Sequence, residues 1–200
     1  MKRKIIVFIL ILGFNFILIN GISYANRVMF EHNFIINLDN ENINENIDNN
    51  VSNNENPSVN TEYNGESIES VAKKLEKYFK KTPLEGYGEH MASSSIKKGA
   101  NPYLIGGIVL ANTKCNTDCT IIFKNCNNVG DLRGSPGCFG GSYKKYNSIE
   151  ESIDDLVDYI YDKFIVNKLT TPTAIYQKYG KDITWAFKVT NYMEKIKKVK

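Results

Sequence analysis

Histidine is scarce in this sequence, which has only His32 and His90 among its 200 residues. His-ligated metal centres and Ser-His-Asp triads both require histidine at the site. So few histidines argue against either kind of site, and we expect neither a metal nor another cofactor. Long runs of alternating apolar and polar residues are also absent, and no segment repeats another, so neither a sheet-rich nor a repeat architecture is indicated.

Cysteine is limited to four residues within one stretch of 24 residues: Cys115, Cys119, Cys126 and Cys138. Their spacing lacks the paired CxxC knuckles of most zinc modules, and a zinc site with four thiolate ligands is the alternative to disulfides. An even, clustered count in a secreted chain predicts two disulfides, with three possible pairings that the sequence does not distinguish. The bridges would staple a loop, residues 126–138, that is rich in Gly, Asn and Pro.

The N-terminus has the pattern of a targeting segment. Basic residues at positions 2–4 precede an apolar run over residues 5–19, and small residues end at Ala25. This pattern predicts a secretory signal over residues 1–25, cleaved after Ala25. An uncleaved membrane anchor is the alternative, because the run is near the lower length limit for a bilayer span. In both cases the rest of the chain lies outside the cytoplasm.

Residues 26–64 are dominated by Asn, Glu, Asp and Ser, with isolated Ile and Val at no fixed period. Such a segment buries too little apolar surface to offset its conformational entropy, so we predict a disordered linker. Residues 65–200 then make one domain of ordinary size. The linker carries a net charge of −6 and the domain +6. A basic domain suits an anionic wall polymer, and almost equally nucleic acid or lipid headgroups.

Helical periodicity accounts for every patterned segment of the domain. Residues 67–80 place apolar side chains on one face and lysines opposite. Asn101 and Pro102 are an N-cap and a first-turn proline in front of an apolar helix. Ser148 and Glu151 form a capping box before about four turns of apolar spacing. Further helices are expected from residue 87 to a C-cap at 99, near 172, and from about 184 to 196. The expected fold is therefore mostly α, with one stapled loop.

Four strings, in order along the domain, resemble segments of the bacterial cell-wall endo-β-N-acetylglucosaminidase family. GANPYLIGGIVLANTKC (residues 99–115) is similar to the family helix that begins at a proline and ends at the catalytic glutamate. CNNVGDLRGSPGC (126–138) resembles the Asn-Asn loop beside the substrate groove. YKKYNSIEESIDDLVDYI (143–160) and KYGKDITW (178–185) resemble the helix that follows, and the tyrosine-containing loop with the last helix. The resemblance implies a lysozyme-like fold over roughly residues 84–197.

The resemblance places Asn112 where the family has its catalytic glutamate. A glycosidase protonates the leaving oxygen of the sugar bond with a carboxylic acid whose pKa is raised by a partly apolar site. An amide has no such proton, and general acid catalysis contributes about 10²- to 10⁴-fold. Asp131 is a candidate substitute acid, although a solvated loop carboxylate is the simpler interpretation. Tyr179 matches an active-site tyrosine of the family, with half-buried packing as the alternative.

Four further side chains are candidates for binding sugar. Asn127 and Asn128 could hydrogen-bond to hydroxyl and N-acetyl groups, but asparagine also suits tight loops, and the two interpretations are compatible. The rings of Tyr146 and Trp185 could stack on a pyranose. Trp185 also belongs to the apolar stripe of the last helix, which favours packing in the core.

We therefore expect a secreted domain of the glucosaminidase type that binds peptidoglycan strands, or other anionic wall polymers, as a monomer but cuts them poorly. It would bind no nucleic acid and would meet a membrane only through an uncleaved signal. Two alternatives stay open. One is an active hydrolase that cleaves between N-acetylglucosamine and N-acetylmuramic acid with Asp131 as the acid. The other is a disulfide-stapled module that binds a protein or an anionic surface without any sugar groove.

Overall fold

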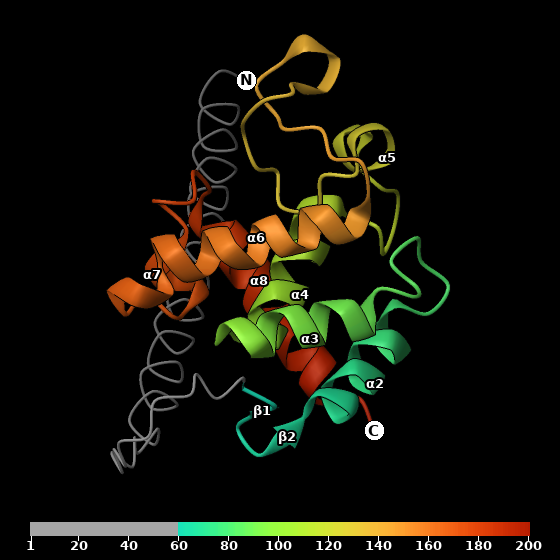
Figure 1. Cartoon of the computed structure of the whole chain (residues 1–200), viewed down its shortest axis with the longest axis vertical. Helices are drawn as coiled ribbons and strands as arrows, with labels where there is room; N and C mark the ends of the chain where they lie inside the picture. Colours follow the sequence, from blue (N-terminus) through green and yellow to red (C-terminus); the bar gives the residue numbers. More distant parts are fainter. Residues whose placement is uncertain (1–59) are drawn as a thin grey trace, which may run out of the picture. The chain divides into compact units, whose positions relative to one another are not determined.

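The computed structural model describes residues 60–200, so the predicted signal and most of the predicted linker lie outside the described residues. The described chain is mostly helical (Figure 1), as the spacing of its apolar residues predicted. Within this part, a two-stranded antiparallel hairpin of β1 (Glu62–Tyr63) and β2 (Glu66–Ser67) accompanies the helices. No helix of residues 60–200 combines the length and apolar composition needed to cross a bilayer.

The helices begin and end close to the predicted positions. They are α2 (Ile68–Phe79), α3 (Gly88–Lys98), α4 (Pro102–Thr113), α5 (Ile121–Cys126), α6 (Ile149–Lys163), α7 (Pro172–Ile175) and α8 (Ile183–Lys197), with 3₁₀ turns η1 (Cys138–Gly140) and η2 (Ile165–Asn167). The predicted caps are present: the Asn101 side chain accepts from the backbone N–H of Tyr103, and that of Ser148 accepts from Glu151. The six-residue α5 was not predicted, because it is too short for a periodic signal.

α4 is the central helix of the domain, and almost all of its residues are buried. α3 and α8 pack directly against α4, while α2 and α6 pack on α3. Apolar side chains from these helices, including Leu104, Ile108 and Val189, form the core. Because neighbouring helices enclose α4, the residues of its last turn are held in a fixed position.

Two glycines allow neighbouring helices to approach α4 closely. A Cβ atom at Gly107 would lie 2.8 Å from the carbonyl oxygen of Val189 and 3.0 Å from Cγ of Met193, both in α8. A Cβ atom at Gly106 would instead lie 2.8 Å from Cδ2 of Leu75, the end of a flexible side chain in α2. A backbone oxygen cannot rotate away, so the spacing of α4 and α8 depends on Gly107.

Gly107→Ala is expected to lower the free energy of unfolding by about 1–3 kcal/mol, because the added methyl group pushes α8 away from α4. The better helix propensity of alanine offsets only about 1 kcal/mol of this loss. Urea denaturation followed by circular dichroism measures the change. Gly106→Ala is the matched control and should lose less, since the Leu75 side chain can shift. Equal stability of the two variants and the wild type would contradict the close-approach argument.

Glu66 fastens the β1–β2 hairpin to the helices. Its carboxylate accepts hydrogen bonds from Nζ of Lys74 and from the hydroxyl of Tyr103, each at 2.7 Å. Burial alone would raise the pKa of Glu66, but these contacts outweigh it and hold the pKa below its ordinary value. The ring of Tyr63 packs edge-on against Tyr103. Residues 60–64, which the sequence assigned to the linker, are among the residues that the structure describes.

Both predicted disulfides are present, and they account for all four cysteines. Cys115 pairs with Cys119 directly after α4. Cys126, at the end of α5, pairs with Cys138 at the start of η1. The second bridge closes the loop that was expected to need a staple, seen in yellow and orange at the top of Figure 1. No cysteine is left to bind zinc.

Candidate functional site

Asn112 lies in the last turn of α4, with only 4% of its surface exposed. Its Oδ1 accepts a hydrogen bond from the indole Nε1 of Trp185 at 2.9 Å, and its Nδ2 donates to the hydroxyl of Tyr179 at 3.3 Å. An indole N–H can only donate, so the amide oxygen must face Trp185 and the amide nitrogen must face Tyr179. The amide therefore joins α4 both to α8 and to the loop that precedes α8.

Tyr179 and Trp185 stack on each other, with ring centroids 5.0 Å apart and planes inclined by 16°. The hydroxyl of Tyr179 also donates a hydrogen bond to the carbonyl oxygen of Gly130. A chain of hydrogen bonds thus runs from Trp185 to Asn112, Tyr179 and Gly130, and each step has a donor and an acceptor. Such a satisfied polar network fixes the relative positions of its members. The fold brings together three residues that the sequence had singled out separately.

The pKa of the Tyr179 hydroxyl lies well above its ordinary value of 10.0, chiefly because the group is buried and secondly because Asp131 is negatively charged. Burial also raises the pKa of Tyr103 and of Tyr146, each of which donates a hydrogen bond to a carboxylate. In all three cases the neutral phenol is the form that the folded protein favours.

Stability should therefore fall steeply above a pH of about 10. Above this pH, Tyr103, Tyr146 and Tyr179 lose their protons in the unfolded chain but keep them in the folded protein. The free energy of unfolding therefore falls by up to about 1.4 kcal/mol per pH unit for each of them. Below a pH of about 10, the three tyrosines are protonated in both states, so their contribution to the free energy of unfolding is complete and does not change with pH. Urea unfolding from about pH 8 to 11 measures the slope.

Tyr179→Phe separates the contribution of Tyr179 to the alkaline loss of stability from those of Tyr103 and Tyr146. It should make the alkaline slope shallower and also lower stability at neutral pH by about 1–3 kcal/mol, because the Gly130 carbonyl and the Asn112 amide lose a partner. An alkaline slope equal to that of the wild type would show that Tyr179 does not stay protonated as inferred.

A pocket of about 350 Å³ opens beside the buried chain, and we call it the Asn112 pocket. This volume falls in the range of small-molecule sites. Its lining residues are Ala111, Asn112, Lys114, Thr120, Ile122, Asp131, Tyr143, Lys181, Asp182, Thr184, Trp185 and Lys188. Three lysines and two acids thus surround an opening with hydroxyl groups, an amide and apolar surface, a mixture suited to a polar ligand.

Asp131 lies where the Asn112 pocket meets a second pocket, because it lines both. It is not the solvated carboxylate of the simpler interpretation: its side chain is 18% exposed and its Oδ2 is 2.7 Å from Nζ of Lys181. Its backbone is left-handed, with φ 52°, a conformation that aspartate tolerates and glycine adopts freely. An ion pair requires an ionised carboxylate, whereas a general acid must start protonated. This pairing therefore suits Asp131 to charge stabilisation better than to proton donation.

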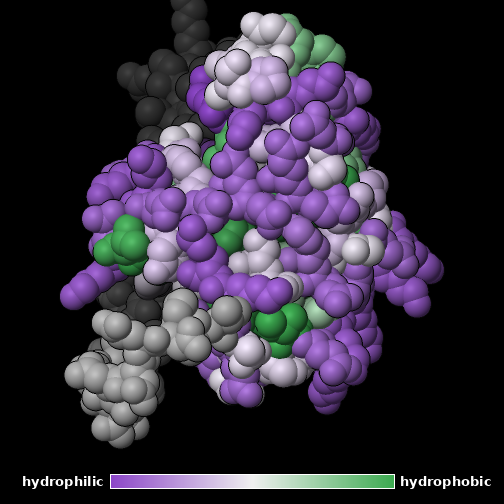
Figure 2. Space-filling view, in the orientation of Figure 1, coloured by the Kyte–Doolittle hydropathy of each residue, from purple (hydrophilic) through white to green (hydrophobic). Residues whose placement is uncertain are grey.

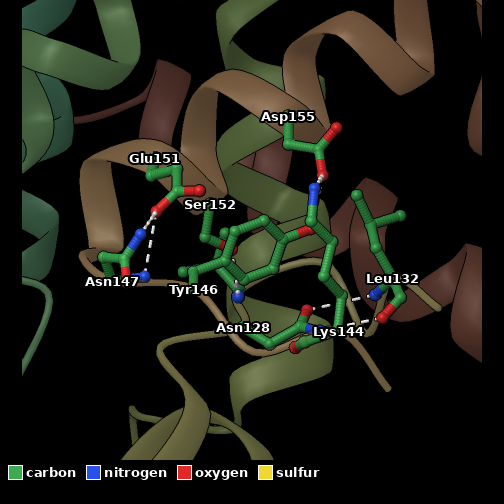
Figure 3. A network of polar contacts seen from close by, with 9 residues as sticks. Asn128, Leu132, Lys144, Tyr146, Asn147, Glu151, Ser152 and Asp155 are labelled. Atoms are coloured by element: carbon green, nitrogen blue, oxygen red, sulfur yellow. Dashed lines mark hydrogen bonds and ion pairs between the residues drawn. The ribbon is translucent and has the colours of Figure 1, made fainter. Parts of the chain in front are cut away.

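The second pocket, of about 400 Å³, is lined by Tyr179 on one side and by Lys144 and Asp155 on the other, and we call it the Asp155 pocket. Asp155 accepts hydrogen bonds from Nζ of Lys144 at 2.6 Å and from the hydroxyl of Tyr146 at 2.7 Å (Figure 3). Burial alone would raise the pKa of Asp155, but these two partners outweigh it, so the pKa lies below its ordinary value. Both acids that line this pocket are therefore paired with a lysine.

Asn127 and Asn128 hold the stapled loop in shape. Asn128 is 1% exposed; its Oδ1 accepts from the backbone N–H of Leu132, and its Nδ2 donates to the carbonyl oxygens of Leu132 and Lys144 (Figure 3). Asn127 ends α5 in a left-handed conformation, and its Nδ2 donates to the carbonyl oxygen of Tyr146 at 3.2 Å. The loop-forming interpretation accounts for both residues, and both amide hydrogens of Asn128 are engaged within the protein.

Tyr146 and Trp185 do not present free ring faces in this structure. Tyr146 is 2% exposed, and Nζ of Lys144 lies 4.7 Å from its ring centroid. Trp185 is 7% exposed and is covered by Tyr179. The prediction that these rings stack on a sugar is therefore not supported by the geometry, because burial leaves no open face. Packing, which the sequence favoured for Trp185, accounts for both side chains.

Four charged residues of the Asn112 pocket were missed in the sequence: Lys114, Lys181, Asp182 and Lys188. Asp182 is the N-cap of α8, and its Oδ1 accepts from the backbone N–H of Trp185 at 2.9 Å. Hydrogen bonds from Thr184 and from this N–H lower the pKa of Asp182. An aspartate directly before an apolar periodic run is a cap signal that could have identified it. Lys181 gave no signal, because its partner Asp131 is 50 residues away in the chain.

No protein-family model matches this sequence, and no curated protein matches it significantly. Within residues 60–200, no group of three or more His, Cys, Asp or Glu side chains is placed to hold a metal ion. The functional conclusion therefore depends on the residues of the two pockets and on the local strings that resemble a known family.

Proposed function

We propose that the helical domain is a secreted, cell-wall-directed module of the glucosaminidase type, with a lysozyme-like fold, that binds peptidoglycan strands but hydrolyses them poorly. The family resemblance of the four strings supports the assignment to this class. The strings converge in space: the end of α4, the Asn-Asn loop and the segment before α8 contribute Asn112, Asp131 and Tyr179 to adjoining pockets.

The bonding of the Asn112 side chain carries the proposal of weak catalysis. An amide at this position has no acidic proton, and its oxygen and nitrogen are already engaged by Trp185 and Tyr179. The acids that line the two pockets are Asp131, Asp155 and Asp182, and each is engaged by a lysine or by the cap of α8. General acid catalysis is worth about 10²- to 10⁴-fold, so a site whose acids are all engaged by other groups would cut slowly at best.

The charge around the Asn112 pocket supports a wall polymer as the partner. Asp131 neutralises Lys181, whereas Lys114 and Lys188 are exposed and also line the opening. An anionic polymer would be attracted to such a surface and to the +6 domain as a whole. The hydroxyl groups of Tyr143 and Thr184 could add hydrogen bonds to a glycan.

An active hydrolase remains the second candidate, and the position of Asp131 favours it. This carboxylate lies between the two pockets, next to the Tyr179 network, where a bound sugar chain would pass. In that case Asp131 would have to leave Lys181 and take up a proton before each catalytic cycle.

Pull-down on purified peptidoglycan, together with zymography on cell walls, tests these proposals. We expect retention on the wall that soluble N-acetylglucosamine oligomers compete away, and no strong lytic band. A band that survives in Asn112→Ala and disappears in Asp131→Asn would overturn the proposal in favour of the active hydrolase. Retention that the oligomers do not reduce, but that falls steeply as the salt concentration rises, would indicate a module that binds surfaces through ionic contacts instead.

A further inference from the structure

The second half of the stapled loop and the residues that follow it fold back as a tight hairpin, residues 133–144, which we call the loop hairpin. Backbone bridges pair Arg133 with Tyr143 and Gly137 with Lys144. At the turn, a Cβ atom on Gly137 would collide with the carbonyl oxygen of Gly141, so the two strands of the hairpin touch there. The disulfide to Cys138 fixes the turn to α5. The end of the loop hairpin is therefore a rigid projection.

Phe139 is at the end of this projection with 73% of its surface exposed. Its backbone is left-handed, with φ 51° and ψ 31°, which is unfavourable for a bulky side chain. Glycine adopts this conformation at little cost, and glycines occupy positions 140 and 141, yet phenylalanine occupies the left-handed position 139. A large apolar ring that is both strained and exposed contributes little to the core, and such outliers are concentrated at binding sites.

A second exposed apolar side chain lies on the neighbouring element. Ile121, the first residue of α5, is 65% exposed. α5 packs against η1, and the Cys126–Cys138 bridge links the two elements covalently. In Figure 2, the end of the molecule that Figure 1 assigns to the loop hairpin shows white and pale green surface beside the purple of the polar residues.

α5 and the loop hairpin both border the Asn112 pocket. Thr120 and Ile122, on either side of Ile121, line the pocket, and so does Tyr143 at the base of the loop hairpin. A chain-like ligand that leaves the pocket past Tyr143 would therefore run along the loop hairpin toward Phe139.

We propose that Phe139 is a stacking platform for a further pyranose ring of a glycan strand held in the Asn112 pocket. An aromatic face matches the C–H face of a sugar, and this inference rests on the proposed function. Two side chains form a patch far smaller than the roughly 800 Å² that each partner contributes to a stable protein interface.

Binding of N-acetylglucosamine oligomers of two lengths to Phe139→Ala tests the platform. We expect affinity for the hexasaccharide to fall about tenfold, the effect of losing one ring stack, with little change for the disaccharide, which the pocket alone can hold. Phe139→Trp should retain hexasaccharide affinity. Val166→Ala is the matched control, because Val166 is 58% exposed on η2, and it should bind both oligomers like the wild type. Isothermal titration calorimetry gives the affinities, and near-ultraviolet circular dichroism confirms the fold.

The outcomes separate this inference from the proposed function. If the wild type binds the hexasaccharide and Phe139→Ala binds it equally well, the platform is refuted and the proposed function survives. If the wild type binds neither oligomer, the proposed function fails and the platform fails with it. If Phe139→Ala keeps its sugar affinity but loses binding to phosphatidylglycerol vesicles that the wild type binds, the exposed ring serves a lipid surface and the platform is overturned.

Discussion

Asn112→Glu is expected to raise lysis of cell walls by about 10²-fold or more over the wild type. The substitution supplies a carboxylic acid at the end of α4, beside the Asn112 pocket, in a position that is almost fully buried. Burial favours the protonated acid, which is the state that can donate to a glycosidic oxygen. The expected size of the gain is that of general acid catalysis itself. Turbidity loss of a peptidoglycan suspension measures the rate, and zymography detects the lytic band.

Asn112→Gln is the control for this prediction. Glutamine has the length of glutamate and the amide of asparagine, so it makes the same demand for space without supplying a proton. Both variants should lose stability, by about 1–3 kcal/mol, because the longer side chain disturbs the bonds to Trp185 and Tyr179. Only the glutamate variant should lyse walls. A folded Asn112→Glu protein with no gain in lysis would mean that the groove, as well as the acid, has been lost.

Removal of the Cys126–Cys138 bridge should lower the free energy of unfolding by about 3 kcal/mol and also weaken wall binding. In the chain-entropy account, a bridge over this sequence separation of 12 restricts the unfolded chain by about that amount. The loop it closes contributes Asp131 to the Asn112 pocket, and Tyr143 lines the pocket five residues beyond the bridge, so binding should suffer beyond the loss of stability. Urea denaturation of the Cys126→Ser, Cys138→Ser double variant, with a pull-down on peptidoglycan, measures both effects.

The other disulfide gives a matched comparison. Cys115 and Cys119 are separated by only 4 positions, and the same account assigns their bridge about 2 kcal/mol. The Cys115→Ser, Cys119→Ser double variant should therefore lose less stability and should keep the loop hairpin in place. If this variant lost more wall binding than the first, the 126–138 loop would not be the element that shapes the pocket.

Local sequence signals were sufficient to predict the helices other than α5. Asn101 followed by Pro102 marks the start of α4, and Ser148 marks the start of α6, because capping depends on residues that are neighbours in the chain. The two disulfides could be predicted from the count and compartment, whereas their pairing could not, since three pairings satisfy the same spacing. The β1–β2 hairpin was not predicted, because strands of two residues have no periodic pattern.

The network in the site could not be predicted, because its contacts connect residues far apart in the chain. Asn112 is 73 positions from Trp185 and 67 from Tyr179, and no local pattern reports such pairs. The sequence identified these residues individually through the family resemblance. It assigned Trp185 correctly to an apolar stripe but gave no sign that its indole N–H would meet Asn112. The sequence also did not predict the ion pair between Asp131 and Lys181. This ion pair suits the Asp131 carboxylate to charge stabilisation better than to proton donation.

The attachment of the β1–β2 hairpin determines how the domain responds to mechanical load. A pull through the preceding chain would reach the fold at this hairpin, where Glu66 transmits it to Lys74 and to Tyr103 in the first turn of α4. Asn112 is nine residues further along the same helix, about 14 Å away. The attachment of the hairpin and the Asn112 pocket thus lie at opposite ends of one helix. Tension applied through the N-terminal side of the domain would therefore be taken up at the first turn of α4, away from the pocket.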